Sequence, residues 1–508
     1  MSDFLINPFS VIPSSVSWLR NFLTFKDTST FMLESGPPNK IAVDSDGNTY
    51  FVGSYLSNAG DTAQLNGTTI ESDTVPFAVL NKWGTSGLNE WTLKARRSAP
   101  SSAAGGNVIF QDVALDSSNN IWVVGTLSGD CTISFGSFSI TGSGTGTDWF
   151  IAKASFNGQW LSAERFNTSI TTAGQDQATR IKIDSNNNLI ISGTFIGTLT
   201  LGSFSVSGST TVQQAFIAKR TNAGTWSWLK GITPSSTANI IDFDLDSSNN
   251  IYVVGDYLTG GFTVDSVTFP APSGSTDNFL IKFNSSGTAQ WGARIGSTVA
   301  DTIKGVAVVT DSKIIVAGHN AAVTVDTTVT SANSTTNNIA RVTVGRQGFL
   351  IYFNASGIYQ NSSRLVSSGG INDTRYMCVF KLGAGRYGVG GMFGSNSTIT
   401  LGNSITGNNA INGTDGFYAV FNASDVPQFC VKTGISTYTG SPTSERFEWT
   451  HSGTLFQSDH FVTISVSRVI TGYVATVNFG NQQISASTVY AGHYTLITKQ
   501  KIDGTWEI

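Results

Sequence analysis

The residues of this chain that could bind a metal ion are aspartates placed before short polar turns. Asp44-Ser-Asp-Gly-Asn48 puts side-chain oxygens at alternate positions, the arrangement that calcium-binding loops use. The corresponding segments at Asp116 and Asp184 keep one carboxylate each, and no Glu follows at the spacing of an EF-hand. An aspartate before a tight turn commonly accepts hydrogen bonds from the backbone of that turn. We therefore predict a turn-capping role for these residues, with calcium binding as the alternative.

The nearest approach to an acid–base cluster surrounds two histidines, His451 and His460. Glu445, Glu448 and Asp459 lie close to them in sequence. The histidines do not have the spacing of a metal site, and no serine stands in a Gly-x-Ser-x-Gly turn beside them. We predict no catalytic, cofactor-binding or metal-binding residues, and we keep an enzyme as one alternative.

The turn aspartates belong to a phrase that recurs along the chain. It consists of apolar–x–Asp, a Ser/Asn/Gly turn and a β-rich run that ends in Gly, and clear copies span 113–125, 181–193 and 243–255. The phrase ends at Gly53, Gly125, Gly193, Gly255, Gly318, Gly390 and Gly472. These glycines are 62 to 82 residues apart, and strand-like runs rich in aromatic and β-branched residues fill the spaces. Repeats of this kind, each with four strand-like segments, predict a β-propeller.

We predict an all-β protein that forms a single seven-bladed β-propeller of four-stranded antiparallel blades over residues 16–508. An extended segment, 1–15, precedes it and could dock on a partner. Strand-like segments led by Trp outnumber the other strands by one, because one lies at Trp18 and another at Trp506. We therefore predict that residues 16–23 supply the outer strand of the last blade and close the ring.

Four segments of one repeat carry a family resemblance. They are Thr198-Leu-Thr-Leu-Gly-Ser-Phe-Ser-Val-Ser-Gly208, Ala215-Phe-Ile-Ala-Lys219, Ala223-Gly-Thr-Trp226 and Asp246-Ser-Ser-Asn-Asn-Ile-Tyr-Val-Val-Gly255. This pattern resembles the SBBP-type β-propeller repeats of bacterial surface and secreted proteins, over nearly the whole chain. It departs from them at 309–313 and 381–386. The resemblance implies the propeller fold and no single activity.

The composition bears on the partners and the location. Charged residues make up 12% of the chain, the net charge is −4, and no Lys/Arg run occurs, which argues against a nucleic-acid partner. The first residues lack the features of a signal peptide, and no apolar run is long enough to cross a membrane. We predict a virion-surface or extracellular location without membrane insertion. The three cysteines, Cys131, Cys378 and Cys430, are predicted to be buried free thiols.

Two interruptions of the repeat, 320–346 and 434–459, are predicted to lie on the same face of the disc. Variable loops on a rigid scaffold often carry binding sites, and exposed aromatic side chains can stack on sugars or anchor a protein. The candidate partner-binding residues are Arg341, Arg346, Tyr438, Phe447, Trp449 and Phe456. The alternative is that these aromatic residues pack against their own blade.

The prediction that follows is a non-catalytic structural or interaction protein on an extracellular surface. We favour a virion component of a capsid, tail or spike that mediates assembly or host attachment. Its partners would be other virion or surface proteins, or a host glycan or receptor. One alternative is a secreted or surface bacterial adhesin that binds carbohydrate or protein. A propeller enzyme is the other, and it would need charged residues that converge from several blades, whereas the innermost strands read as mostly apolar with one turn Asp each.

Overall fold

The computed structural model describes most of the 508-residue chain, and the described residues form β-strands and no helix. The described ranges are 18–26, 40–55, 62–65, 68–71, 77–86, 88–97, 106–144, 146–169, 175–274, 276–299, 301–320, 326–340, 345–369, 373–394, 396–406, 414–438, 448–456, 460–469, 474–479, 482–487 and 492–501. Within these ranges there is accordingly no apolar helix that could cross a membrane. The predicted docking segment 1–15 and Trp506 lie outside the described residues.

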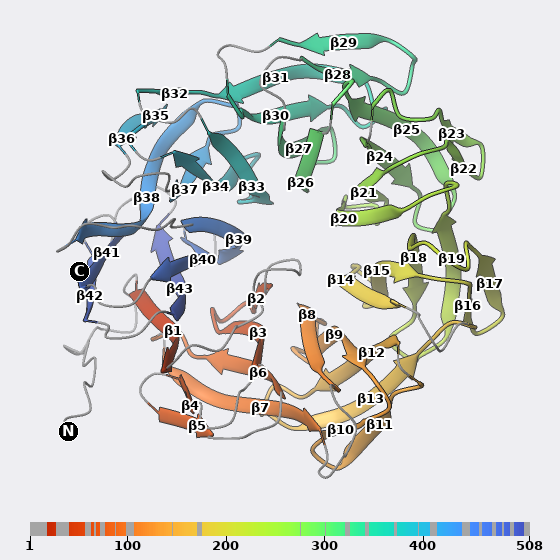
Figure 1. Cartoon of the computed structure of the whole chain (residues 1–508), viewed down its shortest axis with the longest axis horizontal. Helices are drawn as coiled ribbons and strands as arrows, with labels where there is room; N and C mark the ends of the chain where they lie inside the picture. The colour runs from red at the N-terminus through yellow and green to blue at the C-terminus, as the bar shows by residue number, and fades with distance from the viewer. Residues whose placement is uncertain are drawn as a thin grey trace.

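The strands form antiparallel sheets whose four main strands run from the centre of the molecule outward (Figure 1). The innermost strands are β2 (Ile41–Val43), β8 (Val108–Leu115), β14 (Gln177–Ile183), β20 (Ala238–Leu245), β26 (Asp301–Thr310), β33 (Thr374–Lys381) and β39 (Glu448–Phe456). The second strands are β3 (Thr49–Tyr55), β9 (Ile121–Ser128), β15 (Leu189–Phe195), β21 (Ile251–Tyr257), β27 (Lys313–Asn320), β34 (Tyr387–Gly394) and β40 (His460–Val469). Each sheet is named below by its innermost strand.

The outer half of each sheet is built in the same way. The third strands are β6 (Phe77–Trp83), β12 (Thr147–Ala154), β18 (Gln214–Arg220), β24 (Asp277–Phe283), β30 (Gly348–Phe353), β37 (Thr414–Phe421) and β43 (Gly492–Lys501). The outermost strands are β7 (Asn89–Arg97), β13 (Trp160–Phe166), β19 (Trp226–Ile232), β25 (Ala289–Gly296), β31 (Tyr359–Leu365), β38 (Pro427–Tyr438) and β1 (Trp18–Lys26). The outer strand of the β39 sheet is thus β1, which pairs with β43 so that Trp18 lies opposite Lys499.

A small hairpin leaves each sheet between its second and third strands. The hairpins are β4 (Thr62–Leu65) with β5 (Thr68–Glu71), β10 (Thr132–Phe135) with β11 (Phe138–Thr141), β16 (Thr198–Leu201) with β17 (Phe204–Ser207), β22 (Phe262–Val264) with β23 (Val267–Phe269), β28 (Thr327–Thr330) with β29 (Thr336–Ile339), β35 (Thr398–Leu401) with β36 (Asn403–Thr406), and β41 (Val474–Phe479) with β42 (Gln482–Ser487). Four of them extend the outermost strand of the preceding sheet, as β10 does on β7 and β28 does on β25. The β35–β36 hairpin instead pairs with the short strand β32 (Ser367–Ser368), just after β31. These four hairpins therefore cover strand edges that would otherwise stay open for pairing.

The second strands read as continuous apolar runs because both of their faces are buried. In β9, Ile121 and Val123 pack with residues of the β2 sheet, whereas Trp122 and Val124 pack with residues of the β14 sheet. Alternate side chains of a strand point to opposite faces, so one strand contributes to two cores. The hydrophobic cores consequently lie between neighbouring sheets.

The innermost strands follow one another around the centre of the molecule. Each adjoins the innermost strand of the next sheet in sequence, and β39 adjoins both β33 and β2 (Figure 1). This arrangement brings residues from the beginning, middle and end of the chain to one central axis.

Candidate functional site: the central pocket

A β-bulge shapes the innermost strands where they face the centre. The pairing with the second strand shifts by one residue between Phe110 and Asp112, and between Ile240 and Asp242. The same shift precedes Arg180, Gly305, Cys378 and Ser452. A bulge bends a strand and re-aims the side chains that follow it. It therefore sets the direction of the residue that stands four positions before the turn Asp, such as Asp112 before Asp116.

The recurring glycine of the second strand makes room for this bulge. A Cβ at Gly125 would overlap Ile109 O, and a Cβ at Gly255 would overlap Asn239 O. The glycine is thus needed because a bulged backbone approaches it closely. In the β33 sheet the glycine in this role is Gly391, where a Cβ would meet Arg375 O.

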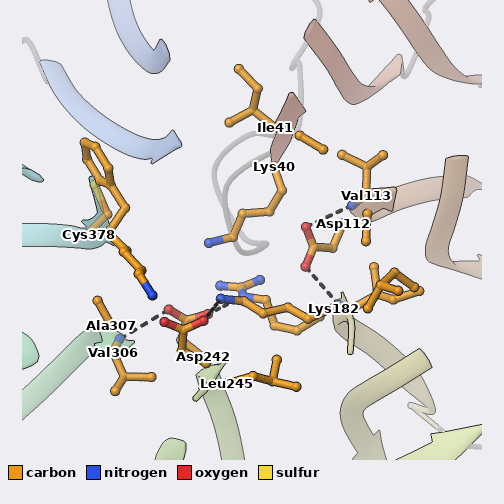
Figure 2. Close-up of a pocket in the computed structure, with 18 of the residues that line it drawn as sticks. Lys40, Ile41, Asp112, Val113, Lys182, Asp242, Leu245, Val306, Ala307 and Cys378 are labelled. Atoms are coloured by element: carbon orange, nitrogen blue, oxygen red, sulfur yellow. Dashed lines mark hydrogen bonds and ion pairs between the residues drawn. The ribbon is translucent and has the colours of Figure 1, made fainter. Parts of the chain in front are cut away.

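Charged side chains from several sheets converge on a pocket of about 410 Å³ at the centre (Figure 2). They stand on the innermost strands or, for Lys40, directly before β2. The charged lining residues are Lys40, Asp112, Arg180, Lys182, Asp242, Asp244, Lys304 and Lys381. The expectation that the innermost strands are mostly apolar with one turn Asp each missed these charges, because the arrangement of the sheets around the centre brings them together from several repeats.

The three carboxylates of the pocket bind the backbone of the neighbouring sheet. Asp112 accepts a hydrogen bond from Ile181 N at 2.9 Å. Asp242 accepts one from Val306 N at 3.3 Å, and Asp244 accepts one from Val308 N at 2.7 Å. These acceptors satisfy amide groups that the next innermost strand presents across the gap between sheets. The aspartates thus join adjacent sheets.

Two ion pairs also cross between the β14 and β20 sheets. Lys182 Nζ lies 2.6 Å from Asp244 Oδ1, and Arg180 Nε lies 3.5 Å from Asp242 Oδ1. Burial lowers the pKa of Lys182, but the negative charges of Asp244 and Asp242 outweigh it and leave this pKa raised. Lys182 therefore stays protonated as the partner of Asp244.

Asp112 is the most enclosed of the pocket carboxylates. Burial raises its pKa, and the positive charges of Lys40 and Arg180 together with the hydrogen bond from Ile181 N oppose that rise. Its two oxygens already accept Val113 N and Ile181 N. Asp112 is accordingly committed to the fold and is not a free general base.

The aspartates of the repeated turns cap those turns. Asp116 Oδ1 accepts hydrogen bonds from Ser118 N and Asn120 N at 3.0 Å each, and Asp116 Oδ2 accepts one from Trp122 Nε1. Asp44 is bound in the same way by its own turn and by Tyr50. These hydrogen bonds confirm the turn-capping interpretation for Asp44 and Asp116.

Neighbouring turns also bind each other. Asn187 accepts a hydrogen bond from Ser117 N and donates one to Ser117 Oγ, and Asn249 makes the same two bonds to Ser185. Asn187 and Asn249 have positive φ values of 62° and 61°, which Asn tolerates better than most residues. The repeated turn therefore links the β8 sheet to the β14 sheet and the β14 sheet to the β20 sheet.

The first predicted interruption, 320–346, contains the hairpin β28–β29, which corresponds to the hairpins of the other sheets. Its interpretation as an insertion is corrected accordingly. Arg346 lies 3.7 Å from Asp373 and is 45% exposed at its side chain. Arg341 lies outside the described residues.

The second predicted interruption, 434–459, overlaps two strands, because β38 runs to Tyr438 and β39 begins at Glu448. Trp449 and Phe456 thus belong to an innermost strand and not to a loop, which corrects the prediction. Phe447 lies outside the described residues.

The histidines of the suspected acid–base cluster stand apart in register. His460 is opposite Phe456 in the hairpin of β39 and β40, whereas His451 occupies the bulge of β39. Glu445 and Asp459 lie outside the described residues.

The three cysteines are buried thiols and none of them is in a disulfide, as predicted. Cys378 lines the pocket, and burial raises the pKa of its thiol to about 12, so it is not a nucleophilic thiolate at neutral pH.

The pocket escaped the sequence interpretation although a signal for it was present. In the first four repeats, the residue four positions before the turn Asp is charged: it is Lys40, Asp112, Arg180 or Asp242. A charged residue that recurs at one position inside an apolar strand indicates either a paired interior or a site. Comparison of the repeats at that column would have found it.

The comparisons with known proteins are distant. No protein-family model matches the chain, so the resemblance to SBBP-type repeats stays a prediction. The chain is 24% identical over 243 residues to an uncharacterized WD repeat-containing protein of Acanthamoeba polyphaga mimivirus, and the match covers 40% of this chain and 17% of that relative. This chain therefore matches only a small part of the relative's length.

The solved structures with a similar backbone also have low sequence identity to this chain. A protein of unknown function from Dyadobacter fermentans is 10% identical, with a TM-score of 0.39 over 76% of this chain and 93% of that one. The NanB sialidase of Streptococcus pneumoniae is 8% identical, with a TM-score of 0.40 over 96% of this chain and 93% of that one. These scores are too low to support an argument about activity. The chain is an all-β repeat protein of propeller architecture with a charged central pocket.

Proposed function

We propose that the chain forms a closed seven-bladed β-propeller that serves as a non-catalytic binding scaffold. The closure is supported by the pairing of β1 with β43 and by the position of β39 between β33 and β2. A ring in which the last blade takes its outer strand from the beginning of the chain leaves no open sheet at the seam. The resemblance to SBBP-type repeats agrees with this architecture.

A crosslink across the seam tests the closure. Arg20 and Ile497 are partners in the register of β1 and β43, so cysteines at both positions are close enough for a disulfide. We expect the oxidised double variant to unfold at a higher temperature than the reduced form, because the bond closes a loop of almost the whole chain. A control pair at Arg20 and Lys501 is out of register and should not crosslink. Failure of the in-register pair to form a disulfide would contradict the closure.

The observation that carries the non-catalytic role is the use of the pocket carboxylates. Asp112, Asp242 and Asp244 each accept a backbone amide of the next sheet, and two of them also hold a cation. A general acid or base must be free to exchange a proton with a substrate. Carboxylates engaged in this way support a scaffold, whose repeated residues hold the blades together.

For the location we propose a virion surface, where the protein mediates assembly or host attachment. The partial relative from Acanthamoeba polyphaga mimivirus supports a viral origin, although its own role is not described. The low content of charged residues agrees with a protein that binds other proteins or glycans and not nucleic acid. Arg346 and the aromatic residues Tyr438, Trp449 and Phe456 stay predicted partner contacts.

Particle fractionation tests the location. Virus particles from the source of the gene would be purified on a density gradient and treated with protease before mass spectrometry. We expect peptides of this chain to co-sediment with particles and to be released by the protease. Peptides found only in the soluble fraction or on bacterial cells would refute the virion proposal and favour the adhesin, and a glycan array would then identify its ligand class.

A further inference from the structure

The central pocket contains more positive than negative charge. Among the described lining residues there are five cations, namely Lys40, Arg180, Lys182, Lys304 and Lys381, and three anions, namely Asp112, Asp242 and Asp244. The difference is two positive charges. A pocket of about 410 Å³ is in the size range of small-molecule sites, which is roughly 300–1,000 Å³. The pocket thus has the volume and the charge to receive an anion.

The cations of the pocket are not equally compensated. Lys182 is paired with Asp244. Within the described residues, Lys40 and Lys304 have no carboxylate within ion-pair distance, and the buried Nε of Arg180 has no hydrogen-bond acceptor despite the neighbouring Asp242. Figure 2 shows the ammonium group of Lys40 directed into the pocket between Asp112 and Asp242. Arg180 is buried and the two lysines are partly buried, and a cation removed from water without a partner is unfavourable, so an anion placed beside it offsets that cost.

The charges that surround Lys40 do not offset the effect of burial on its pKa. Burial lowers its pKa first, and repulsion from Arg180 lowers it further. Attraction to Asp242 and Asp112, and a weaker interaction with Cys378, only partly oppose this. Lys40 therefore gains a proton more readily when a further negative charge enters the pocket.

Lys304 is in a similar position on the bulge of β26. Burial lowers its pKa, and Arg375 lowers it further against the attraction of Asp256. The neighbouring His319 is buried, and its pKa lies well below the ordinary value because of burial and the charge of Lys304. His319 is therefore neutral at pH 7 and adds no charge to this end of the pocket.

We propose that the central pocket binds a small oxyanion, a phosphate or carboxylate group carried by a small molecule, with Lys40, Arg180 and Lys304 as its cationic partners. The three aspartates keep their contacts with the neighbouring sheet. The described lining residues of this site include none of the proposed partner contacts. Its occupancy does not depend on the virion location.

Isothermal titration calorimetry of the full chain with inorganic phosphate, sulfate and citrate tests the site. The titrations would be done at constant ionic strength in chloride, because screening weakens charge interactions. We expect saturable binding at one site per chain for at least one probe. Binding should be accompanied by proton uptake, seen as an enthalpy that depends on the buffer, and should weaken as the pH rises into the range where the lysines lose their protons.

Charge-neutral variants separate this site from general attraction to cations. Lys40→Gln and Lys304→Gln should each weaken binding by tenfold or more. Each removes a partly buried charge that has no ion-pair partner among the described residues, so neither should lower the unfolding temperature. Lys230→Gln is the matched control, since Lys230 pairs with Asp265 on an outer hairpin, 2.6 Å away. If Lys304→Gln does not fold, the Lys40 variant alone decides the result.

Two outcomes would overturn the proposal. One is the absence of saturable binding of all three probes to the folded protein. The other is equal weakening by Lys40→Gln and Lys230→Gln, which would mean that the anions bind through the overall charge. Either outcome leaves the particle test of the scaffold role untouched, because that test does not involve the pocket.

Discussion

Replacing Asp242 by Asn would remove the counter-charge of a buried arginine. The side chains of Arg180 and Asp242 are 6% and 13% exposed, and their ion pair is 3.5 Å long. The new amide oxygen can still accept the hydrogen bond from Val306 N, which is 3.3 Å long in the parent. The substitution therefore isolates the charge of Asp242 from its role as an acceptor.

The size of the effect follows from the ion-pair distance. At an effective dielectric constant of about 20, two unit charges at that separation attract by about 5 kcal/mol. Asn also avoids the desolvation of a carboxylate, which offsets part of this loss. Removal of one partner of a buried pair costs about 3–5 kcal/mol in general. Because this pair is long, we expect Asp242→Asn to lower the free energy of unfolding by about 2–4 kcal/mol.

Urea unfolding followed by tryptophan fluorescence would measure this loss. The double-mutant cycle adds Arg180→Gln and the double variant, and we expect a coupling free energy of about 1–3 kcal/mol. Phosphate titration gives a second reading, because loss of a negative charge beside Lys40 should raise the affinity of Asp242→Asn for phosphate. The two readings move in opposite directions, since the variant is less stable and binds more tightly.

Asp265→Asn is the control for the pair at the centre. Asp265 and Lys230 are each 27% exposed, so loss of this charge should change the free energy of unfolding by less than about 1 kcal/mol. Additivity of Asp242→Asn and Arg180→Gln within about 0.5 kcal/mol would refute the reasoning. So would a loss in the Asp242 variant no larger than in the control.

Three further predictions concern packing, turns and pH. Gly287→Ala should lower the unfolding temperature markedly, because its Cβ would lie 2.5 Å from Trp228 Cδ2. Gly136→Ala is the control. Gly136 also has a positive φ, but its Cβ would make no contact under 3.5 Å, so this substitution should have a smaller effect. Asp246→Ala removes the acceptor of four hydrogen bonds and should lower the free energy of unfolding, measured in urea, by about 2–4 kcal/mol. Asp246→Asn should lower it by less than half as much. Equal losses in the two variants would contradict the turn-capping role. Burial raises the pKa of Asp176 from 3.8 to about 6. Between these pH values the folded state therefore binds more protons than the unfolded state. The free energy of unfolding should fall as the pH rises from about 4 to 6, by at most about 3 kcal/mol. Urea unfolding of Asp176→Asn across this range should lack that decrease, and a flat profile in the parent would contradict the assignment.

The sequence was informative about the local elements because their causes are local. Asp116, with Asn119 at a positive φ, forms the turn that its residue types predict, and the continuous apolar run 121–124 becomes a strand buried on both faces. The Trp-led segment at Trp18 likewise proved to be a strand that pairs with the last described strand, β43. Such features depend on a few neighbouring residues or on the count of repeated segments.

The sequence was misleading where a repeat element was long or degenerate. The residues 327–339 lack the pattern of the other hairpins but form one, because β28 pairs with the outer strand β25 of the preceding sheet. Trp449 stands in β39, whose sequence lacks the repeated pattern. Contacts with β33 and β2 position this strand. Pairing with other parts of the chain decided these elements.

By itself the sequence determined the four-stranded repeat, its Asp-capped turns and the glycine that ends each phrase, since each follows from the preferences of neighbouring residues. Only the tertiary structure decided what the innermost strands do. Lys40, Arg180 and Lys304 are far apart in the chain, and they share one pocket because the sheets are arranged around a common axis. In innermost strands such as β14, β20 and β26 the bulge adds one residue and so changes the direction of the side chains that follow, a shift that the alternation of apolar and polar residues does not reveal. The charge of the centre is therefore a property of how the sheets are arranged and not of any one repeat.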